Sequence, residues 1–384
     1  MSPAPKTLFI VCGEPSGETY AASVARAFRR RFPGAPMEGI GSSALAAEGV
    51  RLLLDYGPIS VVGILEVARH LPAVVSALRA AKRRVGRSDV GAVLLVDFAD
   101  FNFRVGREAH RRNVPVIYYV PPQLWAWRRE RARELAAFTK GVVVPFPFEE
   151  PILRERGVNV RFAGHPLLDA LAPYLDAFPD PARFGIPAGK RVVGLLPGSR
   201  SGEVRVHFPV MAAAARRIAA QFPDVHFAVP LASPRFHGEI ERELEGERLP
   251  LVIVENERHL LFRGMAAAVS ASGTATLELA LLRVPHVIVY RTSAVTYWIG
   301  KRLAKVSSIG LPNIVAGEPF LPELIQGECR PERIASELGL LLSDPARREA
   351  MAARCGSLRE RLSGSGPSEA VVDLLGSQAG GAWG

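Results

Sequence analysis

Cysteine and histidine are scarce in this chain, and their spacing excludes two kinds of structural framework. The 384 residues include three cysteines, Cys12, Cys329 and Cys355, and none of them belongs to a CxxC pair. The eight histidines form no HxxxH pair. A disulfide scaffold and a structural zinc site are therefore not expected. We predict that the chain uses neither a metal ion nor another cofactor.

Long apolar runs are missing as well. No run of the sequence approaches the length of a transmembrane helix. The apolar stretch near the N-terminus is too short for a signal peptide and lacks a convincing cleavage site. The expected compartment is therefore the reducing cytoplasm.

Two nucleotide-binding signatures are also absent. The sequence has no GxxxxGKS/T phosphate loop, and no GxGxxG follows an apolar run, which argues against a dehydrogenase. The net charge of +10 raises the alternative of a nucleic-acid binder, but no RRM, KH or helix-turn-helix signature accompanies it. We expect no nucleic-acid partner. The charge favours a phosphorylated ligand or an acidic membrane surface instead.

What the chain does have is an alternation of short apolar runs with helical segments. Examples of the runs are residues 7–11, 92–96 and 192–196. This alternation predicts parallel sheets covered by helices. The chain is too long for one ordinary core, and the pattern restarts after a proline-rich stretch at 172–190.

We therefore predict an α/β fold with two Rossmann-like, doubly wound parallel-sheet domains that face a cleft. Their expected bounds are residues 1–172 and 190–360. Residues 361–384 are expected to form a tail helix that packs on the first domain. Ligands of such sheets bind beyond the carboxyl ends of the strands. The turns that follow the apolar runs are therefore the candidate sites.

Two such turns in the first domain carry acidic residues. The sequence "GEPSGE" begins at residue 13, and "DFAD" contains Asp97 and Asp100. Each of these residues can have a structural role. Ser16 can cap the next helix, and Glu18 is favourable near the positive N-terminus of that helix. Asp97 can cap the helix that follows it. The alternative is that these side chains act on a ligand.

Two turns in the second domain are rich in small residues. They contain Ser199 with Arg200, and Ser272 with Thr274. Such turns expose backbone N–H groups at the positive end of a helix, which suits phosphate. Arg200 adds a planar cation that matches phosphate oxygens. Glu278 lies one turn further on, where a carboxylate can accept hydrogen bonds from both hydroxyls of a ribose. Ordinary strand-to-helix connections remain the alternative.

Several sequence blocks resemble those of one enzyme family, both in their residues and in their order along the chain. They include "CGEPSGE", "VDFADFN", "WAWR", "LPGSR" and "LPN". From about residue 7 to about residue 335 the chain resembles the lipid-A-disaccharide synthase family, which has the GT-B glycosyltransferase fold. The family's common "EASGD" is "EPSGE" here, and its "DAPDFN" is "DFADFN". These departures leave the roles of Glu18 and Asp100 open.

The resemblance implies an inverting glycosyl transfer. UDP-2,3-diacylglucosamine reacts with 2,3-diacylglucosamine 1-phosphate (lipid X) to give a β-1,6-linked lipid A disaccharide 1-phosphate and UDP. Asp97 is the candidate base, with Glu14 and Asp100 in reserve, and no divalent metal is required. Another UDP-sugar enzyme on the same fold, such as an epimerase, is the alternative. The expected substrate contacts are Glu14, Ser16, Asp100, Ser199, Arg200, Glu203, Ser272, Gly273, Thr274, Glu278, Asn313 and Gln326.

Both substrates implied by the resemblance are lipids, so we expect a peripheral site on the inner face of the inner membrane. Residues 69–135 hold fourteen basic and six acidic residues, a net charge of +8. Trp125 and Trp127 precede basic residues there, and they form either a packed helix start, a cleft wall or a contact with an anionic surface. The alternative for the apolar stretch before Lys82 is a core helix. A homodimer is left open. The expected membrane contacts are Ile64, Leu65, Leu71, Val74, Val75, Leu78, Lys82, Arg83 and Arg84.

Overall fold

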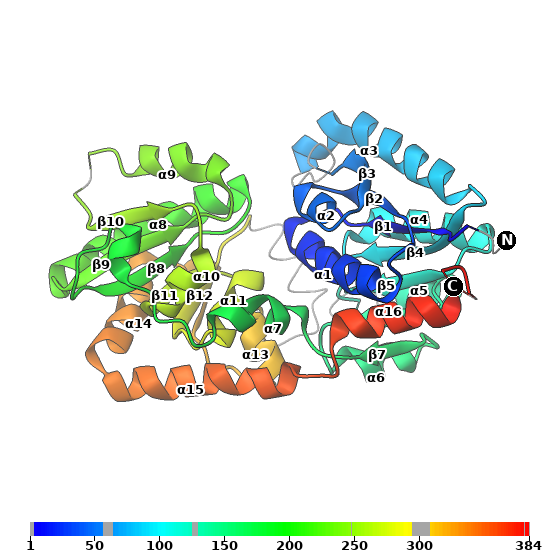
Figure 1. The fold of residues 1–384 in the computed structure, drawn as a ribbon. Coiled ribbons are helices and arrows are strands. Elements are labelled where there is room, and N and C mark those ends of the chain that lie inside the picture. Colours follow the sequence, from blue (N-terminus) through cyan, green and yellow to red (C-terminus); the bar gives the residue numbers. More distant parts are fainter. Residues whose placement is uncertain are drawn as a thin grey trace. The chain divides into compact units, whose positions relative to one another are not determined.

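The computed structural model of the chain describes residues 4–56, 64–124, 130–246, 248–293, 308–379 and 381–383, and it leaves out the side chains of 15, 16 and 64–70. The chain forms two compact units (Figure 1). The first comprises Met1–Pro166 with Leu362–Gly384, and the second comprises Leu167–Arg361. The proline-rich stretch expected to link the domains therefore lies in the second unit, and the C-terminal residues lie in the first.

The first unit is built on a parallel sheet of seven strands in the order β3-β2-β1-β4-β5-β6-β7. Its central pair, β1 and β4, is buried along its whole length because helices cover both faces. The strands are β1 (Thr7–Val11), β2 (Met37–Gly41), β3 (Arg51–Asp55), β4 (Val90–Val96), β5 (Val116–Tyr119), β6 (Gly141–Val144) and β7 (Val160–Phe162).

The helices of the first unit form two layers. Side chains of α3, α4 and α5 share one buried cluster with the sheet, whereas α16 packs against α1 and over β5 and β6. The helices are α1 (Pro15–Arg31), α2 (Ser43–Ala47), α3 (Ile64–Val85), α4 (Ala99–Arg111), α5 (Arg131–Phe138), α6 (Glu149–Arg154) and α16 (Pro367–Gln378).

The second unit is built on a parallel sheet of six strands in the order β10-β9-β8-β11-β12-β13. The strands are β8 (Arg191–Leu196), β9 (Val225–Pro230), β10 (Leu251–Val254), β11 (Met265–Ala271), β12 (His286–Tyr290) and β13 (Glu323–Ile325). The helices are α7 (Pro166–Leu171), α8 (Ser201–Gln221), α9 (His237–Glu243), α10 (Arg258–Arg263), α11 (Thr274–Leu281), α13 (Leu311–Ala316), α14 (Pro331–Ser343) and α15 (Pro345–Leu362).

Both sheets are doubly wound. The strand order reverses between β1 and β4 in the first sheet and between β8 and β11 in the second. The apolar runs of the sequence lie in these buried strands, and the predicted fold of two Rossmann-like parallel sheets is confirmed. Within the described ranges, none of the helices combines the length and the apolar character that crossing a membrane requires.

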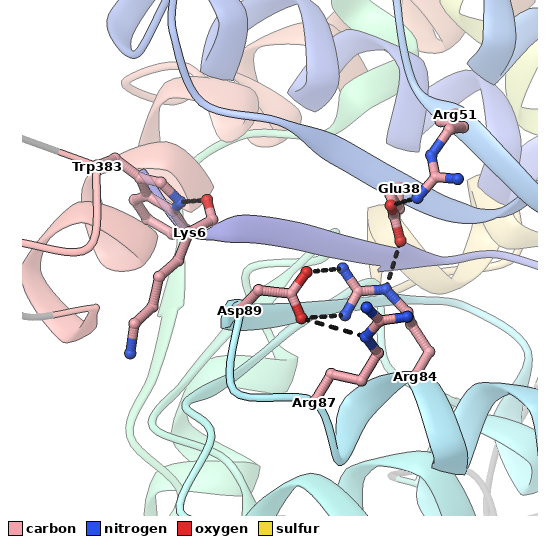
Figure 2. A network of polar contacts seen from close by, with 7 residues as sticks. All are labelled: Lys6, Glu38, Arg51, Arg84, Arg87, Asp89 and Trp383. Atoms are coloured by element: carbon pink, nitrogen blue, oxygen red, sulfur yellow. Dashed lines mark hydrogen bonds and ion pairs between the residues drawn. The ribbon is translucent and has the colours of Figure 1, made fainter. Parts of the chain in front are cut away.

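The two ends of the chain meet at the amino edge of the first sheet. The Lys6 N–H donates to the Ala382 carbonyl at 2.9 Å, and the Trp383 indole donates to the Lys6 carbonyl at 2.7 Å (Figure 2). The indole also lies against the rings of Phe28 and Phe32, with centroids 4.8 and 5.3 Å away. Trp383 therefore ties the C-terminal segment to β1 and α1.

We expect Trp383→Ala to lower the free energy of unfolding of the first unit by about 1–3 kcal/mol, because it removes two ring contacts and a hydrogen bond. Calorimetric unfolding measures the change. Phe178, which is 90% exposed in the second unit, provides the control, and Phe178→Ala should leave the transition unchanged. Equal stabilities for Trp383→Ala and the unaltered chain would contradict this account of the C-terminal segment.

Candidate active site

The four turns selected from the sequence occupy equivalent places in the two sheets. In the first unit they follow β1 and β4, and in the second they follow β8 and β11. Each pair therefore flanks the point where the strand order reverses. At such a point the two connections leave in opposite directions and uncover the carboxyl ends of the strands, which is where ligands of open α/β sheets bind.

Asp97 is the first residue after β4, and its backbone is strained. Asp97 and the following Phe98 both have φ of 50°, in the left-handed region. Non-glycine residues in this region cost about 1–3 kcal/mol each and persist where the surroundings enforce them, often at functional sites. The half-buried Asp97 is therefore held in a conformation that the chain would not choose locally.

The turn that contains Asp97 packs directly on the turn after β1. A Cβ atom at Gly13 would lie 2.3 Å from the Phe98 ring, so only glycine allows this approach. A Cβ atom at Gly17 would lie 3.0 Å from Asp97 Cβ and 3.6 Å from Asp97 Oδ2. The Asp97 carboxylate therefore faces the start of α1.

Two buried side chains hold the Asp97 carbonyl. The Asn102 amide and the Tyr118 hydroxyl each donate to this oxygen at 2.7 Å. Sequence reasoning missed both residues. The available signal was an amide in an otherwise apolar segment of α4, where a fully buried asparagine needs hydrogen-bond partners.

Glu18 has a structural role. Its buried carboxylate accepts hydrogen bonds from the Ser42 N–H and hydroxyl at 2.6 Å each, and from the Leu45 N–H and Tyr56 hydroxyl at 3.1 Å each. It thus satisfies the N-terminus of α2. Burial and the nearby Glu18 carboxylate raise the pKa of Tyr56.

The other carboxylates of the first unit differ in their surroundings. Asp100 has a side chain that is 70% exposed, and its Oδ1 lies 2.7 Å from Arg131 Nη1. Arg131 is itself fixed over the Phe103 ring at 4.0 Å. Glu14 is the half-buried residue that precedes α1, and its side chain does not cap that helix. Among Glu14, Glu18, Asp97 and Asp100, Asp97 is the residue with a left-handed backbone.

In the second unit, a carboxylate of the chain occupies the turn after β8. Glu203 Oε2 accepts a hydrogen bond from the Ser199 N–H at 3.0 Å, and Glu203 Oε1 lies 3.4 Å from Arg200 Nη1. Ser199 and Glu203, both expected to contact substrate, therefore bind each other here, and their contact with a ligand stays a prediction. The Arg200 side chain is 45% exposed and remains accessible.

The turn after β11 is partly committed to the fold. The Ser272 N–H donates to the Val289 carbonyl and the Ser272 hydroxyl donates to the Ile309 carbonyl, both at 2.9 Å. Ser272 was expected to contact substrate, but both of its donors bind backbone. Gly273 is exposed, and no atom lies within 4 Å of where its Cβ would be. Thr274 begins α11, at the helix end whose N–H groups lack intrahelical partners.

Glu278 lies in the first part of α11, as expected, but its carboxylate already has two partners. Oε1 lies 2.9 Å from Arg258 Nη2, and Oε2 lies 3.3 Å from His259 Nε2. Burial raises the pKa of Glu278, and the His259 and Arg258 contacts outweigh this effect, so the pKa lies below its ordinary value. A ribose contact would use an ionised carboxylate that the chain already binds.

Asn313 and Gln326, both predicted to contact substrate, hold loops at the carboxyl edge of the second sheet. The buried Asn313 amide donates to the Leu321 carbonyl and to Glu323, and its oxygen accepts from the N–H groups of 320–321. Gln326 accepts from the Thr292 N–H at 2.8 Å and donates to the Thr292 carbonyl at 3.0 Å. Their amides are engaged by the protein itself.

His207 is a further residue that sequence reasoning missed. It is buried, its Nδ1 lies 3.0 Å from the Pro197 carbonyl, and its Nε2 accepts from the Arg291 N–H at 3.0 Å. Burial lowers the pKa of His207, so the ring is neutral and Nδ1 carries the proton. The ring thus joins the turn after β8 to the end of β12. A single histidine in a helical pattern gives no sequence signal for this role.

The expected membrane contacts on α3 differ in their exposure. Leu71 is 52% exposed, and Arg83 is exposed as expected. Val74 and Leu78 pack partly against the core of the first unit, and Val75 and Lys82 are half-buried. The expectations for Ile64 and Leu65, like those for Ser16, Trp125 and Trp127, lie outside the described residues or side chains.

Arg84, also predicted to contact the membrane, is buried in ion pairs within the first unit. Its side chain is only 6% exposed, and its guanidinium binds both Glu38 and Asp89 (Figure 2). Glu38 also binds Arg51, and Asp89 also lies 3.6 Å from Arg87. Arg84 therefore joins the end of α3 to β2 and to the segment before β4.

In the part of the chain that the structure describes, no group of three His, Cys, Asp or Glu side chains is arranged to hold a metal ion. At the two candidate turns of the second unit, the positive groups include Arg200 and the N-termini of α8 and α11.

Two doubly wound sheets in one chain, each with candidate ligand turns at its reversal point, define the class of GT-B proteins. Solved structures share this fold. They include UDP-GlcNAc 2-epimerase from Neisseria meningitidis bound to UDP-GlcNAc, with a TM-score of 0.66, 14% identity and coverage of 97% of this chain and 100% of that one. The glycotransferase of kitacinnamycin gives a TM-score of 0.64 at 17% identity, with coverage of 98% and 100%.

Sequence relatives give the family. A model of the lipid-A-disaccharide synthetase family matches residues 8–368. Lipid-A-disaccharide synthase of Geobacter sulfurreducens is 39% identical over 97% of this chain and 98% of its own length. The Myxococcus xanthus enzyme is 38% identical over 97% and 98%. The chain belongs to the lipid-A-disaccharide synthetase family, so the predicted family and glycosyltransferase activity are confirmed.

Proposed function

We propose that the chain transfers 2,3-diacylglucosamine from its UDP derivative to 2,3-diacylglucosamine 1-phosphate, with Asp97 as the base and Arg200 at the departing diphosphate. The observation that carries these roles is the place of both residues at a reversal point of strand order. The likeness to UDP-sugar epimerases rests on fold alone, at 12–15% identity for the solved epimerases, whereas the synthase relatives share 33–39%.

Inversion in one step needs two groups with opposite tasks. A base removes the proton of the acceptor hydroxyl while its oxygen forms a bond to the anomeric carbon, and the bond from that carbon to the UDP oxygen breaks on the opposite face. The negative charge that develops on the diphosphate needs fixed positive groups. Asp97 supplies the carboxylate that removes the proton. Arg200 and the exposed turn at Gly273 and Thr274 supply the positive groups that stabilise the diphosphate.

We expect Asp97→Asn to lower the rate of disaccharide formation by about 10²–10⁴-fold, because the amide keeps the shape of the side chain but cannot accept a proton. Mass spectrometry of reactions with both lipid substrates measures the product. Asp100→Asn is the matched control, since it loses one exposed ion pair, and it should stay active. An active Asp97→Asn beside an inactive Asp100→Asn or Glu14→Gln would assign the base to another carboxylate.

We also propose that the protein binds the inner face of the inner membrane as a peripheral protein, through the outer surface of α3, α4 and α5. Leu71 and Arg83 are exposed there. A groove of about 430 Å³ on this surface is lined by Lys82, by three arginines that include Arg104, by His110 and by a single acidic residue, Glu134. This charge is complementary to anionic phospholipid head groups, and the aliphatic stems of the basic side chains suit the interface.

We expect the protein to sediment with vesicles that contain anionic phospholipid at low salt and to be released by salt. Because each basic residue near such a surface contributes about 1 kcal/mol, changing Lys82, Arg83 and Arg104 together to serine should weaken binding by up to about 100-fold. Changing Arg242 and Arg248 of the second unit to serine is the control. The proposed surface is wrong if the triple variant binds as well as the unaltered chain.

A further inference from the structure

We infer that Asn102 and Tyr118 are positioning residues, which hold Asp97 in its left-handed conformation and thereby set the rate of transfer. The inference rests on the proposed role of Asp97 as the base. Both side chains are fully buried, so each would act through Asp97 rather than on a substrate.

The backbone of Asp97 is held on both sides. Its N–H donates to the Tyr119 carbonyl at 3.2 Å. Its carbonyl accepts hydrogen bonds from the Asn102 amide and the Tyr118 hydroxyl at 2.7 Å each, and these two bonds use both lone pairs of that oxygen. These bonds fix the peptide planes before and after Asp97. The φ of 50° is therefore held in place by three hydrogen bonds.

Asn102 also joins the two strands at the reversal point. Its Nδ2 lies 3.2 Å from the Val96 carbonyl and 3.4 Å from the Val11 carbonyl, in addition to its bond with Asp97. Three carbonyl oxygens around one end of the amide require that end to be the donor. Asn102 thus holds the end of β1, the end of β4 and the Asp97 turn in one arrangement.

The two ends of the Asn102 amide differ in their surroundings. Its Oδ1 is buried and accepts no hydrogen bond within the described residues. Buried polar atoms without a partner are uncommon and costly in folded proteins. An asparagine that leaves one end unsatisfied while the other end fixes a strained aspartate fits a site that trades stability for the position of a side chain.

Tyr118→Phe removes the hydroxyl and keeps the ring, which makes it the sharpest test. We expect kcat to fall by about 10- to 100-fold, because a small displacement of a reacting group is costly, while KM for both lipid substrates and the affinity for UDP stay within about twofold of the unaltered values. Tyr119→Phe is the matched control, since Tyr119 is equally buried on the same strand and points to the opposite face. It should keep kcat.

A second arm separates positioning from support of the fold. On an Asp97→Asn background, Tyr118→Phe should cause no further loss of activity, because residues that act through one group are not additive. Asn102→Ser should reduce kcat as Tyr118→Phe does, while its unfolding temperature stays that of the unaltered chain. An unchanged kcat for Tyr118→Phe beside an inactive Asp97→Asn would overturn the inference alone. Additive losses in the double variant would also overturn it, whereas an active Asp97→Asn would overturn the proposed base.

Discussion

The reversal of strand order is the constraint on which the candidate turns of each unit depend. Between β1 and β4, and again between β8 and β11, neighbouring parallel strands send their connections to opposite sides. The carboxyl ends of these strands are left uncovered, and backbone groups there need partners. In the first unit the resulting position presents a carboxylate, Asp97. In the second it presents a guanidinium, Arg200, beside the N-terminus of α8.

Buried polar side chains supply those partners. Asn102 binds carbonyls at the ends of β1 and β4, and His207 joins the turn after β8 to the end of β12. Gln326 and Asn313 hold further loops at the same edge of the second sheet. All four are uncharged in these roles and hold the strand ends by hydrogen bonds alone. Asp97 and Arg200 can therefore act in a fixed polar framework.

The sequence was sufficient to predict the two sheets and the four turns, because both follow from local patterns of apolar runs and small residues. It could not tell which polar residues of a turn face a ligand and which bind backbone. The partners of Glu18 lie 24 to 38 residues away, and Glu38, which binds Arg84, lies 46 residues away. Gln326 likewise binds Thr292, 34 residues away, a contact that a fold is needed to form.

The central claim is a division of tasks: the first sheet carries the base, and the second binds the nucleotide diphosphate. Titration calorimetry of UDP against Asp97→Asn and Arg200→Ala tests it most directly. The account predicts unchanged UDP affinity for Asp97→Asn. For Arg200→Ala it predicts a loss of about 10- to 100-fold, the size of one charge-assisted hydrogen bond, which Arg200→Lys should restore poorly because a point charge cannot match two phosphate oxygens. Unchanged UDP affinity in Arg200→Ala, or a comparable loss in Asp97→Asn, would contradict the account.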